Sequence, residues 1–387
     1  MLKLGTLFSG IGAVEQALIR MNIKHKIIFA CDNGDIDIDI DIDKEKLKVF
    51  NMNSKVKKKK YVDELYHSKS RKQNYVKQSY LANYKINEND FHYDVRLLDG
   101  RDYKDKIDLL VGGSPCQSFS SVGFKGGLDD VRGTLFYEYA RIIQEVQPKV
   151  FIYENVRGLI THDSGNTWNK MQKVFTETLH YKISEPKVLN AADYGIPQNR
   201  RRLFVIGIRE DLVSKEFVYP KEIGLNNLKY FMQDFLEDNC KYDEKSNNFT
   251  YSKKDGSIQL KKIPGIVDKK YTLTSKVRDY VLKSGTKNFR TSTQTDMKVA
   301  RTLLRTMTQH HRAGVDNYIT ISEDKNEKII RSLTERECLR LMGFPDSFKI
   351  VVSTQQMLKQ AGNSIVVDVM MAILKEIYNT GVFNEMK

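Results

Sequence analysis

Four short apolar runs, each followed at once by a polar or glycine-rich loop, constrain the fold of this chain most strongly. They read KLGTL (Lys3–Leu7), IIFACD (Ile27–Asp32), IDLLV (Ile107–Val111) and VFIY (Val150–Tyr153). Runs without polar alternation suit strands that are covered on both faces, as in a parallel sheet between helices. The helix-like segment AVEQALIR follows the first run. We therefore predict an α/β fold on an open, mostly parallel sheet with helices on both faces.

Composition and cysteine usage exclude several protein classes. The chain has 387 residues, 40% hydrophobic and 29% charged, which is typical of a globular protein with more than one domain. No apolar run reaches the roughly 18 to 20 residues of a membrane span. The N-terminus lacks the layout of a signal peptide. The cysteines, at positions 31, 116, 240 and 338, stand far apart without a CxxC pair. We therefore expect a cytoplasmic protein that has neither a disulfide scaffold nor a metal site.

The formal net charge of +14 is concentrated in two segments. Residues 44–85 hold 13 Lys and Arg against 3 Asp and Glu, and residues 215–330 hold 22 against 15. Such a balance favours a polyanionic partner, and nucleic acid is the commonest. Residues 44–85 follow the repeat GDIDIDIDID. They fit either an electrostatic arm along phosphates or a surface helical insertion, and both alternatives stay open.

The loops after the first strands carry the residues expected to hold a cofactor. The loop Phe8–Gly12 (FSGIG) has glycines that let the backbone approach a ligand. A dinucleotide fingerprint needs a third glycine where this chain has Glu15, so an adenosyl cofactor without a pyrophosphate suits the loop better. Asp32 directly follows the second run and can accept the hydroxyls of a ribose. Asp94 takes a similar place after a further expected strand, although a surface acid is the simpler interpretation of its position alone.

Candidate catalytic residues follow the third and fourth runs. Cys116 lies in a Gly/Ser/Pro loop, where a thiol can become nucleophilic. Glu154 directly follows VFIY, and ligands of open α/β sheets bind beyond the carboxyl ends of the strands. We therefore expect Cys116 and Glu154 to be neighbours. Arg200 and Arg202 share one face of an extended chain, where they could hold a phosphate or an ionised base. A basic surface run is the alternative.

Taken in this order, these residues resemble the C5-cytosine DNA methyltransferase family. FSGIG looks like the first motif of the family, PCQSFS (Pro115–Ser120) like its catalytic loop and DVRGTLF (Asp130–Phe136) like the next block. Glu154-Asn155-Val156 is similar to the ENV element, and Gln198-x-Arg200-x-Arg202 to the QxRxR element. RSLTERECLRLMGFP (Arg331–Pro345) and AGNS (Ala361–Ser364) look like the two closing motifs. The resemblance spans nearly the whole chain outside 34–90 and 215–330.

The resemblance implies a DNA (cytosine-5)-methyltransferase that uses S-adenosylmethionine and flips its target base out of the duplex. Cys116 would attack C6 of cytosine, Glu154 would share a proton with N3, and Arg202 with Arg200 would hold O2 and a nearby phosphate. The residues expected at the reacting base are Pro115, Cys116, Gln117, Glu154, Asn155, Arg200 and Arg202. Those expected at the cofactor are Phe8, Gly10, Ile11, Gly12, Asp32, Asn33, Asp94, Val95, Leu135, Asn363 and Ser364. Those expected at DNA are Ser118, Ser120, Arg290, Arg301, Thr302 and Arg305.

The same resemblance suggests a division of the chain. We expect a catalytic domain over 1–214 with a basic insertion at about 34–90, a smaller irregular target-recognition domain over 215–330, and closing motifs with a C-terminal helix over 331–387. Two positions depart from common family choices: Asp32 stands where Glu is more frequent, and Asn33 where an apolar residue often packs on adenine. Residues 276–312 hold 9 Lys and Arg against 2 Asp and Glu, and their loops suit DNA contacts.

Three other functions remain as alternatives. A tRNA cytosine-5 methyltransferase of the same fold typically carries a Cys-Phe-Thr tripeptide, which this sequence lacks. A catalytically silent DNA-binding regulator would have lost Cys116, Glu154 or Arg202, and a nicotinamide oxidoreductase would keep the third glycine. We expect a monomer that acts on double-stranded DNA in the bacterial cytoplasm or nucleoid, without a metal. It would be the modification half of a restriction-modification system, with a cognate endonuclease encoded nearby, or a solitary bacterial or phage enzyme.

Overall fold

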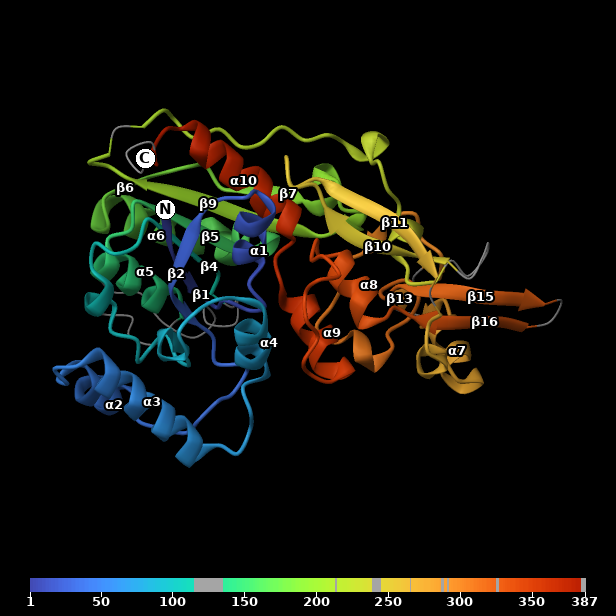
Figure 1. The fold of residues 1–387 in the computed structure, drawn as a ribbon, viewed down its shortest axis with the longest axis horizontal. Coiled ribbons are helices and arrows are strands. Elements are labelled where there is room, and N and C mark those ends of the chain that lie inside the picture. The colour runs from blue at the N-terminus through green and yellow to red at the C-terminus, as the bar shows by residue number, and fades with distance from the viewer. Residues whose placement is uncertain are drawn as a thin grey trace.

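A single mixed sheet forms the centre of the fold. The computed structural model describes residues 1–114, 135–212, 214–238, 245–264, 266–286, 289–290, 292–324 and 327–383. Within them, eight strands form a sheet in the order β3-β2-β1-β4-β5-β9-β6, with β7 also paired to β9 (Figure 1). The five strands from β3 to β5 are parallel, and β9 pairs antiparallel with β5, β6 and β7, so β9 runs opposite to the other strands of this sheet. The predicted open, mostly parallel α/β sheet is confirmed.

The apolar runs form the middle of this sheet. Its strands are β1 (Leu2–Leu7), β2 (His25–Cys31), β3 (Phe91–His92), β4 (Leu109–Gly112), β5 (Val150–Val156), β6 (Tyr181–Ile183), β7 (Lys187–Asn190) and β9 (Arg201–Arg209). Adjacent residues of one strand enter different cores: Leu109 and Val111 belong to one apolar cluster and Leu110 to the other. Both faces are therefore covered, as the unbroken apolar runs predicted.

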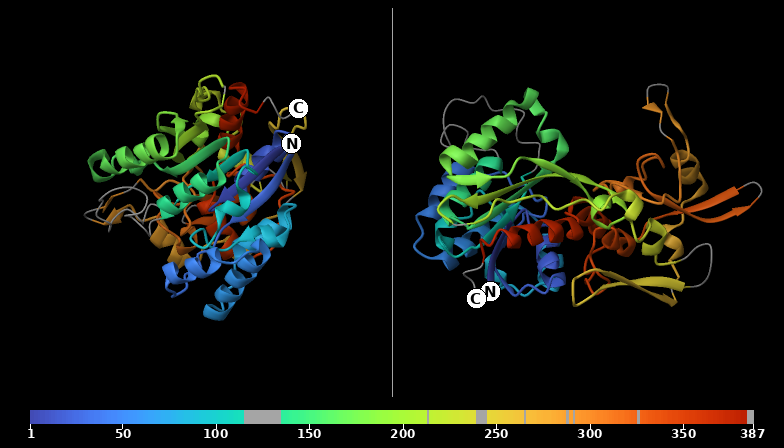
Figure 2. Two further views of the ribbon diagram at one scale, coloured as in Figure 1. Left: turned by 90° about the vertical axis from the view of Figure 1, so that its left-hand side faces the viewer. Right: turned by 90° about the horizontal axis from the view of Figure 1, so that it is seen from above.

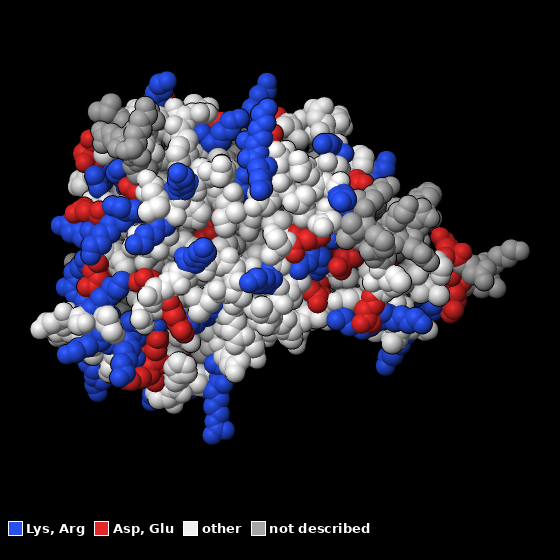
Figure 3. All heavy atoms as spheres, in the orientation of Figure 1, with Lys and Arg blue, Asp and Glu red and all other residues white. Residues whose placement is uncertain are grey.

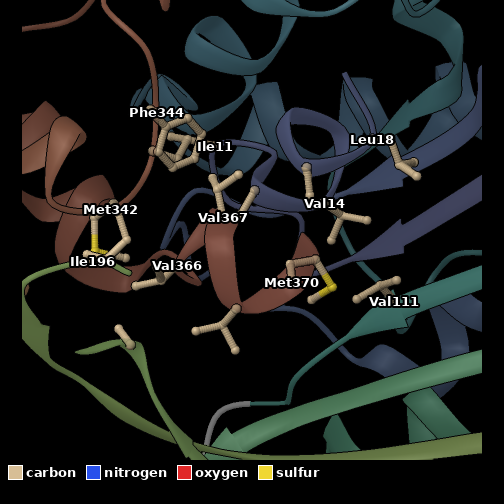
Figure 4. Packing of buried hydrophobic residues seen from close by; sticks show 14 of the residues in the cluster. Ile11, Val14, Leu18, Val111, Ile196, Met342, Phe344, Val366, Val367 and Met370 are labelled. Atoms are coloured by element: carbon tan, nitrogen blue, oxygen red, sulfur yellow. The ribbon is translucent and has the colours of Figure 1, made fainter. Parts of the chain in front are cut away.

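Helices from distant parts of the chain cover the two faces. The helices α5 (Leu135–Val146) and α6 (Asn166–Lys173) supply one cluster. On the other face, α1 (Ala13–Arg20) packs against α10 (Val367–Asn379). Figure 4 shows Val367 and Met370 of α10 beside Ile11 and Val14, next to Phe344. The C-terminal helix α10 therefore packs against the FSGIG loop and the helix α1 that follows it.

The segment between β2 and β3 forms a helical layer on the body. Its helices are α2 (Ile42–Phe50) and α3 (Lys55–Lys69), at the lower left of Figure 1, and α4 (Tyr75–Asn83), nearer the centre below α1. The isoleucines of the DIDIDID repeat alternate inward, with Ile36 fully buried, because an extended chain turns alternate side chains to one side. Several lysines pair with acids of this segment or of the adjoining body, such as Lys58 with Asp99 at 2.7 Å. Figure 3 accordingly shows acidic among basic side chains in this region.

The region after β9 is built mainly from hairpins. Its elements are β10 (Lys245–Tyr251), β11 (Ile258–Pro264), α7 (Ser275–Val281), β12 (Gly285–Thr286), β13 (Phe289–Arg290), β14 (Ala300–Arg301), β15 (Tyr318–Asp324) and β16 (Glu327–Ser332), while the short β8 (Gln198–Asn199) lies just before β9. The hairpins β10–β11 and β15–β16 lie on the right of Figure 1, away from the main sheet. The short β14 pairs with β8, which ties this region to the start of β9.

The chain then returns through three helices to the main sheet. The helix α8 (Glu335–Arg340) begins with a capping box between Thr334 and Glu337, and α9 (Thr354–Asn363) precedes α10. Figure 2 shows α10 running from the hairpin side back to the main sheet. Thr354–Asn379 is long and apolar enough to cross a membrane by composition. However, 67% of its most apolar window is buried, as expected of a core helix.

Candidate active site

The carboxyl ends of the five parallel strands meet at one edge of the sheet. The strand order changes direction between β1 and β4, since β2 and β3 lie on one side of β1 and β5 lies beyond β4. Open α/β sheets bind their ligands at such a switch point. The FSGIG loop leaves β1 there, and Gly113 and Ser114 follow β4 beside it. The FSGIG turn and Gly113–Ser114, which lead into the segment expected to carry the nucleophile, therefore share one edge.

The FSGIG turn has a backbone that requires glycine. Phe8, Gly10 and Gly12 have φ angles of 53°, 53° and 77°, in the left-handed region. A Cβ on Gly12 would lie 2.2 Å from the Tyr84 ring, so this glycine also permits close packing. Gly10 has no described atom within 4 Å of its Cβ position, so the turn is open there. Ile11 is fully buried and anchors the turn.

Asp32 closes this turn from the end of β2. Its carboxylate accepts the amide hydrogens of Gly10 at 2.9 Å and Gly34 at 2.8 Å. Burial raises the pKa of Asp32, and the two amides oppose that shift. The neighbouring Asn33 uses its side chain within its own turn, accepting from Asp35 and donating to Ile36. Asn33 therefore takes the role of a turn residue.

Both carboxylate oxygens of Asp94 already accept hydrogen bonds from other residues of the protein. It accepts from the backbone amide of Arg96 at 2.9 Å, from the Arg96 guanidinium at 2.7 to 3.1 Å, and from the Tyr66 hydroxyl at 2.8 Å. A carboxylate offers about four lone-pair positions, and these contacts use them. Direct hydrogen bonding of Asp94 to a cofactor is therefore at odds with this arrangement. Val95, the next residue, is buried against α5.

The other residues expected at the cofactor border the same edge. Leu135 is half-buried at the first position of α5. Asn363 is exposed at the end of α9, whereas Ser364 is buried and its hydroxyl donates to the carbonyl of Ile365.

Glu154 and Arg202 form the central charged pair. They come from neighbouring antiparallel strands, and Arg202 Nε lies 3.1 Å from Glu154 Oε1. Burial raises the pKa of Glu154, while Arg202 and then Arg200 oppose this shift. A Cβ on Gly113 would lie 2.7 Å from Glu154 Oε2. Glycine is therefore needed where the chain leaves β4, and sequence analysis missed this residue because its signal lies only in a distant contact.

Asn155 fixes the start of the segment that carries Cys116. Its amide donates to the carbonyl of Ser114 at 2.9 Å and to the Tyr153 hydroxyl at 2.8 Å. Tyr153 and Ser114 also share a hydrogen bond at 2.8 Å. The predicted residues Pro115, Cys116, Gln117, Ser118 and Ser120 lie outside the described residues.

Arg200 has a different set of partners from the expected one. It is 3% exposed, and its guanidinium donates to the carbonyls of Leu303, Gly362 and Ser364 at 2.7 to 3.0 Å. Burial without a paired carboxylate lowers its pKa. Although two-residue spacing suggested that Arg200 and Arg202 hold the base together, Arg200 instead joins the chain after β14 to the end of α9. The reason is tertiary: these carbonyls come from residues more than 100 positions away.

The described residues expected at DNA differ in whether their side chains form hydrogen bonds within the protein. Arg305 is exposed, whereas Arg301 donates to the carbonyl of Gln294 and Thr302 to the carbonyl of Asn199. The side chain of Arg290 lies outside the described residues.

A buried carboxyl group behind the turn was overlooked. Sequence analysis treated Glu15 only as the missing third glycine. Its side chain is fully buried, and it accepts hydrogen bonds from Thr6 at 3.1 Å and from Tyr80. Burial raises its pKa from 4.5 to about 7. The polar residue Thr6 in an otherwise apolar run was the available signal.

Comparison with known proteins identifies the family. Residues 66–379 match the family model of the C-5 cytosine-specific DNA methylase. The chain is 33% identical over 315 residues to the type II methyltransferase M.HpaII of Haemophilus parainfluenzae, covering 76% of this chain and 78% of that one. It is 36% identical over 277 residues to the type II methyltransferase M.HhaI of Haemophilus parahaemolyticus, covering 71% and 76%.

Solved structures agree at the level of the fold. The S. pombe Dnmt2 methyltransferase superimposes with a TM-score of 0.63 at 19% identity, over 100% of both chains. A putative DNA modification methyltransferase from an E. coli prophage gives a TM-score of 0.53 at 19% identity, over 98% of this chain and 99% of that one. The family match and the type II relatives together establish that this chain belongs to the C-5 cytosine-specific DNA methylase family and is a DNA (cytosine-5)-methyltransferase.

Proposed function

We propose that this enzyme flips one cytosine out of duplex DNA within a short specific sequence and methylates its C5 after attack by Cys116 at C6. The observation that carries the proposal is the half-buried Glu154–Arg202 pair at the carboxyl edge of the sheet. It lies against Gly113, from which Ser114 leads directly into the segment containing Cys116. An acid with a raised pKa and a guanidinium at one point suit a ring that gains negative charge.

The chain's residues fit S-adenosylmethionine, which supplies an electrophilic methyl group when bound. The open position at Gly10 would allow the backbone to approach the cofactor. The Asp32 carboxylate accepts one amide on each oxygen, which leaves lone pairs for two ribose hydroxyls. Phe8, Ile11 and Gly12 would shape the same turn, with Val95, Leu135, Asn363 and Ser364 around it. Asp94 would contribute through the loop that it orders.

Each side chain at the base has a separate task. Bond formation between the Cys116 sulfur and C6 moves ring electrons toward N3, where Glu154 supplies a proton. Arg202 stabilises charge at O2. The resulting enamine makes C5 nucleophilic toward the methyl group that S-adenosylmethionine would supply, with S-adenosylhomocysteine as the leaving group. Transfer of the C5 proton to a water molecule, cleavage of the sulfur–C6 bond to restore the Cys116 thiolate, and return of the N3 proton to Glu154 would then release 5-methylcytosine. Pro115 and Gln117 would shape the nucleophile loop, and Asn155 holds its first residue.

The DNA would lie between this edge and the hairpin region. Arg305 is exposed for phosphate contact, and Arg290, Arg301, Thr302, Ser118 and Ser120 are the further candidates. Because named relatives are type II methyltransferases, we propose a modification role in a restriction-modification system. A monomer in the cytoplasm suffices for this role, with a cognate endonuclease encoded separately.

The test joins chemistry with sequence specificity. Duplexes that contain 5-fluorocytosine should form a covalent adduct with the wild-type protein and cofactor, and an adduct that survives Cys116→Ala would refute the nucleophile. Bisulfite sequencing of host DNA after expression should show protected cytosines within one short motif. Conversion of every cytosine would refute the proposed specific methylation. Protection of that motif from an endonuclease of the same specificity would test the modification role.

A further inference from the structure

The segment between β2 and β3 contacts the FSGIG turn and the loops that carry Asp32 and Asp94. Tyr66 of α3 donates to Asp94 after β3, and Asn74 donates to the carbonyl of Asp32 after β2. Tyr80 of α4 donates to Glu15 of α1, and Tyr84 donates to the carbonyls of Ile11 and Gly12 in the FSGIG turn. Figure 1 shows α4 beside α1 on this side of the molecule. The contacts of Tyr66, Asn74 and Tyr84 each place a polar group on a loop assigned to the cofactor, and Tyr80 bonds the helix that follows the FSGIG turn.

The contact between Tyr66 and Asp94 is buried and specific. Tyr66 is 3% exposed and Asp94 is 5% exposed, and their oxygens lie 2.8 Å apart. The Tyr66 ring stacks on Tyr93 with centroids 5.0 Å apart, which fixes the direction of the hydroxyl. Burial and the neighbouring carboxylate raise the pKa of Tyr66, so its hydroxyl remains a donor. Loss of this hydroxyl would leave one oxygen of a buried carboxylate with fewer donors.

Asn74 makes a similar contact on the other acidic loop. Its Nδ2 donates to the Asp32 carbonyl at 2.8 Å, while its Oδ1 caps α4 by accepting from Lys77 at 2.8 Å. A Cβ on Gly34 would lie 2.4 Å from this Oδ1, so the loop after Asp32 packs directly on the side chain. One residue therefore ties the start of α4 to the end of β2.

Several lysines of the segment between β2 and β3 form ion pairs with acids that lie near or after β3 or in α5. Lys58 lies 2.7 Å from Asp99 and 3.0 Å from Asp102, and Lys46 lies 2.8 Å from Glu138 of α5. Lys55 lies 2.6 Å from Asp90, just before β3. These pairs neutralise part of the local positive charge and dock the helices onto the body. The charge that suggested a phosphate-binding arm is in large part directed inward.

We propose that Tyr66 and Asn74 are positioning residues for the cofactor, which hold the loops of Asp94 and Asp32 in their binding arrangement. This inference rests on the proposed function, in which those loops hold S-adenosylmethionine. Preorganised loops lower the ordering cost of binding, so the effect belongs to cofactor affinity rather than to the chemical step. The segment between β2 and β3 then stabilises the loops of Asp32 and Asp94 in the conformation that binds the cofactor.

The decisive comparison uses two tyrosines of the same helix. Tyr66→Phe removes the hydroxyl on Asp94, whereas Tyr61→Phe removes a hydroxyl that bonds Glu45 of α2, away from the ligand loops. In the full-length enzyme, Tyr66→Phe should raise the KM for S-adenosylmethionine and the Kd for S-adenosylhomocysteine about five- to tenfold, the scale of a typical intramolecular hydrogen bond. The KM for DNA and kcat at saturating cofactor should stay within about twofold. Tyr61→Phe should leave all four quantities unchanged.

A second variant separates positioning from folding. Asn74→Asp keeps one oxygen that caps α4. Its second oxygen replaces the amide nitrogen and faces the Asp32 carbonyl, to which that nitrogen donated. It should weaken S-adenosylhomocysteine binding by a similar factor, with circular dichroism like that of the wild type. Equal cofactor affinity in Tyr66→Phe, Asn74→Asp and Tyr61→Phe would overturn the proposal. If Asp32→Ala also binds S-adenosylhomocysteine normally, the failure lies in the proposed cofactor site itself.

Discussion

The contact between Gly113 and Glu154 yields the sharpest prediction for catalysis. A Cβ on Gly113 would stand 2.4 Å from the Glu154 carbonyl oxygen and 2.7 Å from Oε2. Since real Cβ contacts essentially never fall below 3.0 Å, Gly113→Ala must move one group by at least 0.6 Å. A misplacement of about 1 Å at a reacting group costs roughly a hundredfold in rate. We therefore expect kcat to fall about ten- to a hundredfold, or about 1.4 to 2.7 kcal/mol in activation free energy.

Gly158→Ala is the matched control. This glycine lies in the short 3-10 helix Arg157–Leu159 after β5, with no described atom within 4 Å of its Cβ position. Neither glycine has a positive φ, so both substitutions are free of backbone strain. Transfer of labelled methyl groups to DNA under single-turnover conditions would measure the rate. Melting curves and S-adenosylhomocysteine affinity would confirm an intact fold. A Gly113→Ala enzyme as fast as Gly158→Ala would refute the reasoning.

Three further predictions follow from buried charged groups. Glu154→Gln removes the proton that N3 requires, so kcat should fall about 10²- to 10⁴-fold while the Kd for DNA, measured by gel shift, stays near that of the wild type. Glu15 has a folded pKa of about 7 against 4.5, so its contribution to the free energy of unfolding should decrease by about 3 kcal/mol as pH rises from 4.5 to 7. Urea titrations of Glu15→Gln across this range should show a flatter pH dependence; an unchanged slope would contradict the shifted pKa. Arg20 is 1% exposed and binds Asp368 and the carbonyls of Gly256 and Gly343. Arg20→Met should therefore lower the urea-derived free energy of unfolding by about 3 to 5 kcal/mol, and a loss below 1 kcal/mol would show that the pair is dispensable.

The pattern of apolar runs and loop residues determined the framework of this protein. Each of the four runs forms a strand of the central sheet. A segment without polar alternation can bury its apolar side chains only where both faces of the sheet are covered. The motifs after these strands also identified the family, since they depend on residue type and order rather than on contacts. Glu154 and Asp32 consequently lie at the predicted edge of the sheet.

Only the tertiary structure decided which partner each polar group takes. Arg200 and Arg202 look equivalent in sequence, yet one clamps distant carbonyls and the other meets Glu154. Asp94 appeared free for a ligand, but Tyr66 and Arg96 occupy its oxygens. The +10 of residues 44–85 left both a phosphate-binding arm and a surface insertion open, and many of those lysines pair with acids of the insertion or of the adjoining body. Local patterns fix periodicity and burial, but the pairing of charges depends on which distant segments the fold brings within hydrogen-bonding distance.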